Sequence, residues 1–259
     1  MEHNVKTQVG DTVERFSNRV ENYVKYRPHY PPAVLELFRA EMGLTPGSIV
    51  ADIGSGTGIS SELFLKNGNT VYGVEPNPKM REAAERYLKR FPDFHSVDGT
   101  AEATGLADDL VDIVVAGQAF HWFDPVGAKR EFRRISKDGG NVALMWNERQ
   151  LDTTPFLREY EAFLIKYSKD YEVVRHLTFD ASRLSDIFEN GIRTKSFPNS
   201  QEFDFDGLKG RLLSASYVPA EDDARFPAMV SELRSLFAKH AQNDRITVFY
   251  DTNVYYTQY

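Results

Sequence analysis

The sequence of 259 residues contains no cysteine. This absence excludes disulfide bonds, cysteine-ligated zinc, iron–sulfur clusters and a thiol nucleophile. Histidine is scarce as well, because the six histidines are scattered and none has a second histidine or a glutamate at metal-ligand spacing. We therefore expect no metal site.

Long apolar runs and an excess of basic residues are also missing. No apolar run approaches the ~18 residues that a membrane-spanning helix needs, and residues 1–16 have no apolar signal core. The 38 acidic residues outnumber the 31 basic ones and give a net charge of −7, which disfavours a nucleic-acid partner. The sequence predicts a cytoplasmic protein without a membrane or nucleic-acid partner, and it carries no signal for an oligomeric state.

Short apolar runs alternate with longer helical segments in the first half of the chain. Strands are expected at residues 48–54, 70–76, 93–99, 110–120 and 141–147, and helices at 59–68, 78–90 and 127–140. After residue 147 the pattern becomes mainly helical, and residues 245–259 read as a final strand. This order predicts an α/β fold: a doubly wound, Rossmann-like, mostly parallel seven-stranded sheet with helices on both faces and a partly helical cover.

A glycine-rich loop follows the first expected strand, in the stretch IVADIGSGTGISSEL. Such a loop lies at the ligand-binding edge of a doubly wound sheet, and glycines let the backbone approach a ligand closely. No lysine follows Gly58, which excludes a P-loop, and Ile59 stands where a dinucleotide fingerprint has its third glycine. Asp52 would repel a pyrophosphate, so the loop favours a ligand with a positive charge and no phosphate.

The pattern Asp52-x-Gly54-x-Gly56-x-Gly58 resembles motif I of the class I S-adenosylmethionine-dependent methyltransferases. The likeness extends over residues 16–147 and is to the small-molecule branch, methyltransferase type 11-like, including trans-aconitate-type enzymes. It implies S-adenosyl-L-methionine as cofactor and methyl transfer by direct in-line displacement to a small-molecule acceptor, with a carboxylic acid as one candidate. A protein acceptor and an NAD-binding oxidoreductase remain as alternatives.

The resemblance divides the chain into four parts of one structural domain. It implies an N-terminal helical flap over the cofactor site at 1–40, a cofactor-binding core at 41–148, a substrate cover at 149–244 and a terminal strand that rejoins the sheet at 245–259. The residues that it implies for cofactor binding are Arg27, Asp52, Gly54, Ser55, Gly56, Gly58, Glu75, Pro76, Asn77, Met80, Thr100, Ala101, Glu102, Gln118 and Ala119.

Individual roles follow from position. Glu75 ends the second strand, where a carboxylate accepts both ribose hydroxyls, and residues 100–102 would lie beside the adenine. Arg27 would pair with the cofactor carboxylate. His121 is either a general base or a packed aromatic side chain. The residues proposed to contact the substrate are His121, Trp122, Trp146 and Tyr217. Arg211 is a candidate for binding an anionic group or an ordinary surface arginine.

Overall fold

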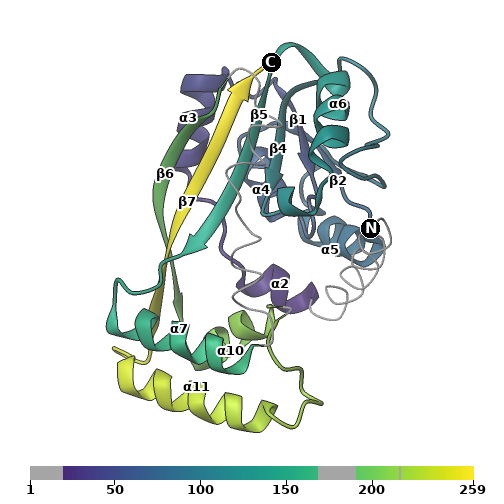
Figure 1. The fold of residues 1–259 in the computed structure, drawn as a ribbon. Coiled ribbons are helices and arrows are strands. Elements are labelled where there is room, and N and C mark those ends of the chain that lie inside the picture. Colours follow the sequence, from purple (N-terminus) through teal and green to yellow (C-terminus); the bar gives the residue numbers. More distant parts are fainter. Residues whose placement is uncertain (1–19, 169–190, 216) are drawn as a thin grey trace. The chain divides into compact units, whose positions relative to one another are not determined.

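The computed structural model describes residues 20–168, 191–215 and 217–259. The chain forms two compact units (Figure 1). The sheet unit comprises His29–Glu148, Leu177–Asn199 and Asp251–Tyr259, and the helical unit comprises Met1–Pro28, Arg149–His176 and Ser200–Tyr250. The four segments predicted from the sequence follow a different division of the chain, and they stay predictions.

Seven strands form one sheet in the order β3-β2-β1-β4-β5-β7-β6. The neighbouring pairs β1–β2, β1–β4, β2–β3 and β4–β5 are parallel, and β7 runs opposite to β5 (Figure 1). This mostly parallel sheet confirms the predicted fold class. The strand bounds are β1 Ile49–Ile53, β2 Thr70–Val74, β3 Phe94–Val97, β4 Val111–Gly117, β5 Ser136–Arg149, β6 Arg193–Phe203 and β7 Ile246–Gln258.

Helices connect the strands of the sheet unit. Asn77 caps one of them, because its side-chain oxygen accepts hydrogen bonds from the backbone N–H groups of Lys79 and Met80, and Pro78 occupies the first helical position. The helices of this unit are α3 Ala33–Met42, α4 Ile59–Leu65, α5 Pro78–Leu88, the short 3₁₀ helix η1 Phe120–Trp122 and α6 Pro125–Ile135.

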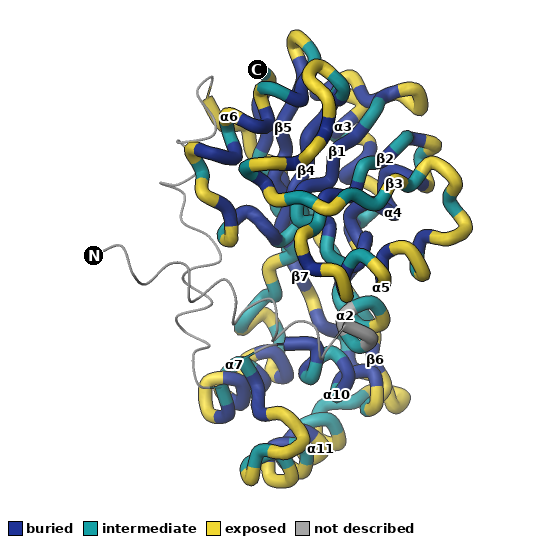
Figure 2. Tube along the Cα trace, turned by 90° about the vertical axis from the view of Figure 1, so that its right-hand side faces the viewer, coloured by how far each residue is buried: buried dark blue, intermediate teal, exposed yellow. Residues whose placement is uncertain are grey.

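Both faces of the central strands are buried. On one face, Ala51 and Ile53 of β1 belong to the same apolar cluster as Phe132 of α6. On the other face, Val50 of β1 and Val115 of β4 have no exposed surface. Figure 2 shows this buried interior in dark blue. Helices therefore cover both faces, as the near-continuous apolar strands require in a parallel sheet.

The predicted boundary between the helix and the strand around residue 140 is wrong. The sequence predicts a helix at 127–140 that ends in the Gly139-Gly140 pair, but α6 ends at Ile135 and β5 begins at Ser136. The pairing of β4 with β5 shifts register here, from Val111 opposite Ser136 to Ile113 opposite Asn141. The two glycines therefore lie in a strand irregularity, where the positive φ of Gly139 is accommodated.

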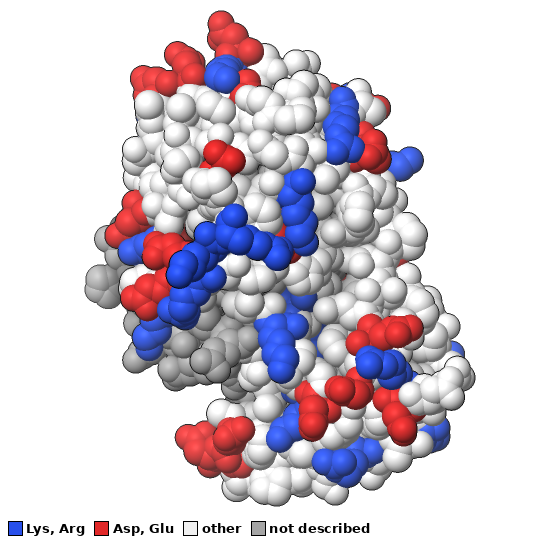
Figure 3. Space-filling view, turned by 180° about the vertical axis from the view of Figure 1, so that it is seen from behind, with Lys and Arg blue, Asp and Glu red and all other residues white. Residues whose placement is uncertain are grey.

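The helical unit has its own apolar core. Its helices are α2 Val20–Tyr26, α7 Pro155–Tyr167, α10 Phe205–Leu213 and α11 Phe226–His240. Val248 and Tyr250 of β7 are buried in this core and alternate with more exposed residues along the strand. On the face that Figure 3 shows, this unit carries both acidic and basic side chains. Lys166 forms an ion pair with Glu232.

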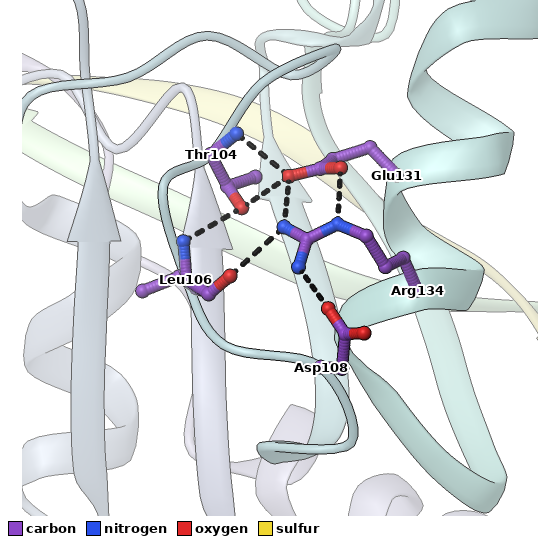
Figure 4. A network of polar contacts seen from close by, with 5 residues as sticks. All are labelled: Thr104, Leu106, Asp108, Glu131 and Arg134. Atoms are coloured by element: carbon purple, nitrogen blue, oxygen red, sulfur yellow. Dashed lines mark hydrogen bonds and ion pairs between the residues drawn. The ribbon is translucent and has the colours of Figure 1, made fainter.

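A polar network joins the loop after β3 to α6 (Figure 4). The Glu131 carboxylate accepts hydrogen bonds from the backbone N–H and the hydroxyl of Thr104, at 2.8 and 2.6 Å, and it pairs with the guanidinium of Arg134. Arg134 also donates to the carbonyl of Leu106 and the carboxylate of Asp108. The side chains of α6 therefore hold the loop in place through the backbone N–H of Thr104 and the backbone carbonyl of Leu106.

Candidate functional site

The predicted ligand edge lies where the strand order reverses. β1 and β4 are neighbours in the sheet. The strand that follows β1 in the chain, β2, lies on one side of this pair, and the strand that follows β4, β5, lies on the other. Ligands of doubly wound folds bind at this switch point, beyond the carboxyl ends of the strands. Two loops reach it from these strands, residues 54–58 after β1 and residues 118–122 after β4.

The three glycines of the first loop have different functions. All have positive φ, at +67° for Gly54, +55° for Gly56 and +84° for Gly58. A Cβ on Gly54 would lie 2.6 Å from the Cβ of Ala119, and one on Gly58 would lie 2.6 Å from Cδ1 of Leu88. A Cβ on Gly56 would meet nothing within 4 Å. Gly54 and Gly58 thus allow close packing, whereas Gly56 leaves backbone open to a ligand.

Asp52 is fully buried at the end of β1. Its Oδ2 accepts hydrogen bonds from the hydroxyls of Ser60 and Ser61, each at 2.6 Å. Within the described part of the chain, its Oδ1 has no hydrogen-bond partner. Burial raises the pKa of Asp52 to about 6, although the two serine hydrogen bonds act in the opposite direction. The described part of the site therefore contains a carboxylate oxygen to which none of its groups donates a hydrogen bond.

Glu75 follows β2, beside the glycine loop. Its carboxylate accepts hydrogen bonds from the backbone N–H of Gly56 at 3.0 Å and of Asn77 at 2.9 Å. Burial raises the pKa of Glu75, while these two hydrogen bonds lower it. Each carboxylate oxygen has capacity for a further hydrogen bond. Of the neighbouring predicted residues, Pro76 is exposed, whereas Met80 is buried.

The loop after β3 holds the residues predicted beside adenine. Thr100 is exposed and forms paired backbone hydrogen bonds with Ala103, and Ala101 belongs to the core. The Glu102 carboxylate accepts a hydrogen bond at 2.9 Å from the backbone N–H of Asp124, the residue that caps α6. The Glu102 side chain therefore also helps to hold the start of α6.

The loop after β4 contains a strained residue. Gln118 has a φ of +61°, which is uncommon for a residue other than glycine and concentrates at functional sites. Its backbone N–H donates to the carbonyl of Met145, and its side-chain amide donates to the carbonyl of Asn147. His121 is half-buried, with its ring centroid 4.4 Å from that of the exposed Trp122.

Three predicted residues do not belong to these loops. Trp146 is 2% exposed and packs in the core against Phe120 and Tyr255, which favours a packing role. Arg27 and Tyr217 belong to the helical unit. There, Arg27 donates a hydrogen bond to the carbonyl of Ser214 at 3.1 Å. The sheet unit holds all the other predicted cofactor-binding residues, including Ser55, whose backbone N–H donates to Val74.

Sequence reasoning missed several residues that shape the site. Ser60 and Ser61 orient Asp52, and their place in the first turn after the glycine loop was a usable signal. Thr57 has a fully buried hydroxyl without a hydrogen-bond partner among the described residues. A Cβ on Gly117 would lie 2.6 Å from the hydroxyl oxygen of Tyr30. Tyr30 and Gly117 are far apart in the sequence, so no local pattern indicates this contact.

Within residues 20–168, 191–215 and 217–259, no three His, Asp or Glu side chains gather in a way that would hold a metal ion. None of the described helices is long and apolar enough to cross a membrane.

Comparisons with known proteins agree with this geometry. The family described as "Methyltransferase domain" matches residues 51–144. An uncharacterized methyltransferase-like protein of Schizosaccharomyces pombe is 27% identical over 248 residues, which cover 93% of each chain. An uncharacterized methyltransferase of Mycobacterium tuberculosis is 35% identical over 136 residues, which cover 52% of each chain.

A solved structure has the same fold. A putative type II methyltransferase from Anaeromyxobacter dehalogenans superposes with a TM-score of 0.63 at 21% identity, covering 90% of this chain and 98% of that one. Together with the sequence matches, the fold and the glycine loop define the class of protein. The chain is a class I S-adenosylmethionine-dependent methyltransferase, and S-adenosylmethionine is its cofactor.

Proposed function

We propose that this methyltransferase acts on a small-molecule acceptor and holds its cofactor chiefly through Asp52, Gly56 and Glu75. The observation that carries the cofactor assignment is the buried Oδ1 of Asp52, which has no hydrogen-bond partner in the described structure. A cofactor ammonium group would satisfy this oxygen by a charge-assisted hydrogen bond. The net charge of −7 supports a small acceptor over a nucleic acid.

The other site residues would contact the remaining groups of the cofactor. Glu75 would accept hydrogen bonds from the ribose hydroxyls, residues 100–102 would lie beside the adenine, and Gln118 would lie at the methionine end. When bound, the cofactor supplies an activated methyl group that is transferred in line to the acceptor without a covalent enzyme intermediate. The protein contributes positioning and the exclusion of water, and positioning alone is worth ~7–11 kcal/mol.

His121 is the candidate general base. Its half-buried ring lies in the loop after β4, next to Trp122. A histidine suits proton transfer near neutral pH, and an acceptor with a dissociable proton would require it. Under this role, His121→Asn keeps the affinity for S-adenosylhomocysteine and lowers turnover; unchanged turnover would show that the histidine has only a packing role.

The acceptor class is tested by following a labelled methyl group. The full chain is incubated with methyl-labelled S-adenosylmethionine and, separately, with the small-molecule, protein and nucleic-acid fractions of a cell extract. We expect the labelled methyl group to appear in a product of the small-molecule fraction that is not the cofactor itself. Glu75→Ala should form much less of this labelled product. Transfer only to the protein fraction would replace the proposal by the alternative of a protein acceptor.

Asp52 predicts a pH dependence of cofactor binding. Because its pKa is raised to about 6, its carboxylate is charged above this pH and neutral below it. Affinity for S-adenosylhomocysteine should therefore be highest above pH 6 and should decrease as the pH is lowered through 6. Calorimetry with Asp52→Asn is the matched control, which should bind about tenfold more weakly at neutral pH. An identical pH profile in both proteins would remove Asp52 from the contact.

A further inference from the structure

Arg211 lies in the last turn of α10, among tyrosines of the helical unit. Its Nε donates to the hydroxyl of Tyr250 at 3.3 Å, and its Nη1 donates to the hydroxyl of Ser214 at 3.4 Å. Its electrostatic neighbours are the phenol groups of Tyr160, Tyr217 and Tyr250, which contribute to a raised pKa of the guanidinium. We call these four residues the arginine–tyrosine cluster.

The charge of Arg211 has no carboxylate counterion among the described residues. No carboxylate in the part of the chain that the structure describes forms an ion pair with it, and the groups that chiefly act on its charge are the phenols of Tyr250, Tyr217 and Tyr160. Burial raises the pKa of Tyr160 well above the usual range, so that this phenol stays neutral. A partly buried cation is costly unless an anion or a set of acceptors compensates it. The partial negative charge at the end of α10 offers only a fraction of this compensation.

A second arginine in the same region shows the contrast. Arg149 lies over the ring of Tyr160, with its guanidinium carbon 5.3 Å from the ring centroid. It forms an ion pair with Glu161, and both side chains are nearly buried. The described residues of the helical unit therefore supply an acidic partner to one arginine beside Tyr160 and none to the other. The missing partner of Arg211 is a specific feature of its surroundings.

The hydrogen bonds of Arg211 leave donors for a ligand. A guanidinium has more N–H groups than the two long bonds to Tyr250 and Ser214 use. Its planar arrangement of donors matches the oxygens of carboxylates and phosphates, with which it forms paired hydrogen bonds. The hydroxyls of Tyr250 and Ser214 lie beside it as further polar groups.

We propose that Arg211 binds the anionic oxygen group, carboxylate or phosphate, of a small ligand, with Tyr160, Tyr217 and Tyr250 around it. The anion site stands on the arginine–tyrosine cluster alone. The further statement that this ligand is the methyl acceptor rests on the proposed function.

Binding of simple anions to the full chain tests the site. Saturation-transfer NMR compares benzoate and phenyl phosphate with uncharged benzamide, which has a similar shape. We expect at least one anion to bind more tightly than benzamide, and Arg211→Gln to weaken that binding by about 10- to 100-fold. Arg234→Gln removes an exposed positive charge from α11 and should leave the affinity unchanged. The two anions distinguish a carboxylate site from a phosphate site.

Three results would overturn the anion site: no binding of either anion, equal binding of benzamide, or unchanged anion binding in Arg211→Gln. Arg211→Lys keeps the charge without the planar fork, and should bind with intermediate affinity even if Arg211→Gln folds poorly. Calorimetry with S-adenosylhomocysteine separates the two proposals, because Arg211→Gln should keep its cofactor affinity. Anion binding without any methyl transfer would refute the acceptor assignment and leave the anion site in place.

Discussion

Replacing Glu75 by alanine should lower the affinity for S-adenosylhomocysteine by about 100-fold. The Glu75 carboxylate is held by the backbone N–H groups of Gly56 and Asn77, which leaves oxygen lone pairs for both ribose hydroxyls. Hydrogen bonds to a charged group contribute ~1.5–3 kcal/mol each, and ~1.4 kcal/mol corresponds to a factor of ten in affinity. Calorimetry measures the loss directly.

Two further variants make this result specific. Glu75→Gln keeps one acceptor oxygen and nearly the same shape, so its affinity should fall between those of the wild type and Glu75→Ala. Glu85→Ala removes an exposed carboxylate from α5 and should change nothing. Thermal unfolding is recorded for each variant, because Glu75 also holds the glycine loop. Wild-type affinity in a folded Glu75→Ala protein would place the ribose elsewhere.

Replacing Glu131 by alanine should lower the free energy of unfolding by about 3 kcal/mol. This carboxylate is 7% exposed and accepts hydrogen bonds from Thr104 and Arg134. Its removal leaves buried donors without their acceptor, which is among the most costly kinds of substitution. Urea unfolding measures the loss, and Glu82→Ala, which disrupts only an exposed pair with Arg86, should cost less than about 0.5 kcal/mol.

The same carboxylate predicts a pH dependence of stability. The hydrogen bonds from Arg134, followed by those from Thr104, lower the pKa of Glu131 from 4.5 to about 2. Its contribution to stability is therefore complete above pH 4.5 and is lost as the pH is lowered from 4.5 through about 2. The difference in unfolding free energy between wild type and Glu131→Ala should shrink over this range. A constant difference would mean that the charge of Glu131 does not stabilise the fold.

The sequence is sufficient to predict those parts of the fold that depend on residues close together in the chain. The alternation of strands and helices reflects local periodicity, and the cap formed by Asn77 needs only the next three residues. The end of α6 was not predictable in this way, because the irregularity at Gly139 and Gly140 arises from pairing with β4. A Gly-Gly pair after a helical pattern is compatible both with the end of a helix and with an irregularity in the following strand.

The same distinction holds for the site. The conformations of Gly54, Gly56 and Gly58 follow from a short motif, so the loop could be read directly. Contacts between distant segments could not. Trp146 is in the core because Tyr255, far along the chain, packs against it. That no acidic side chain of the described segments pairs with Arg211 becomes visible only when its spatial neighbours are known.

The loop after β3 and helix α6 hold each other in place by hydrogen bonds. Glu102 of the loop accepts a hydrogen bond from the start of α6, and Glu131 of α6 accepts hydrogen bonds from Thr104 of the loop. These reciprocal contacts form when the protein folds. A ligand that meets this loop therefore meets a preorganised surface, and the conformational entropy of ordering it does not reduce the affinity.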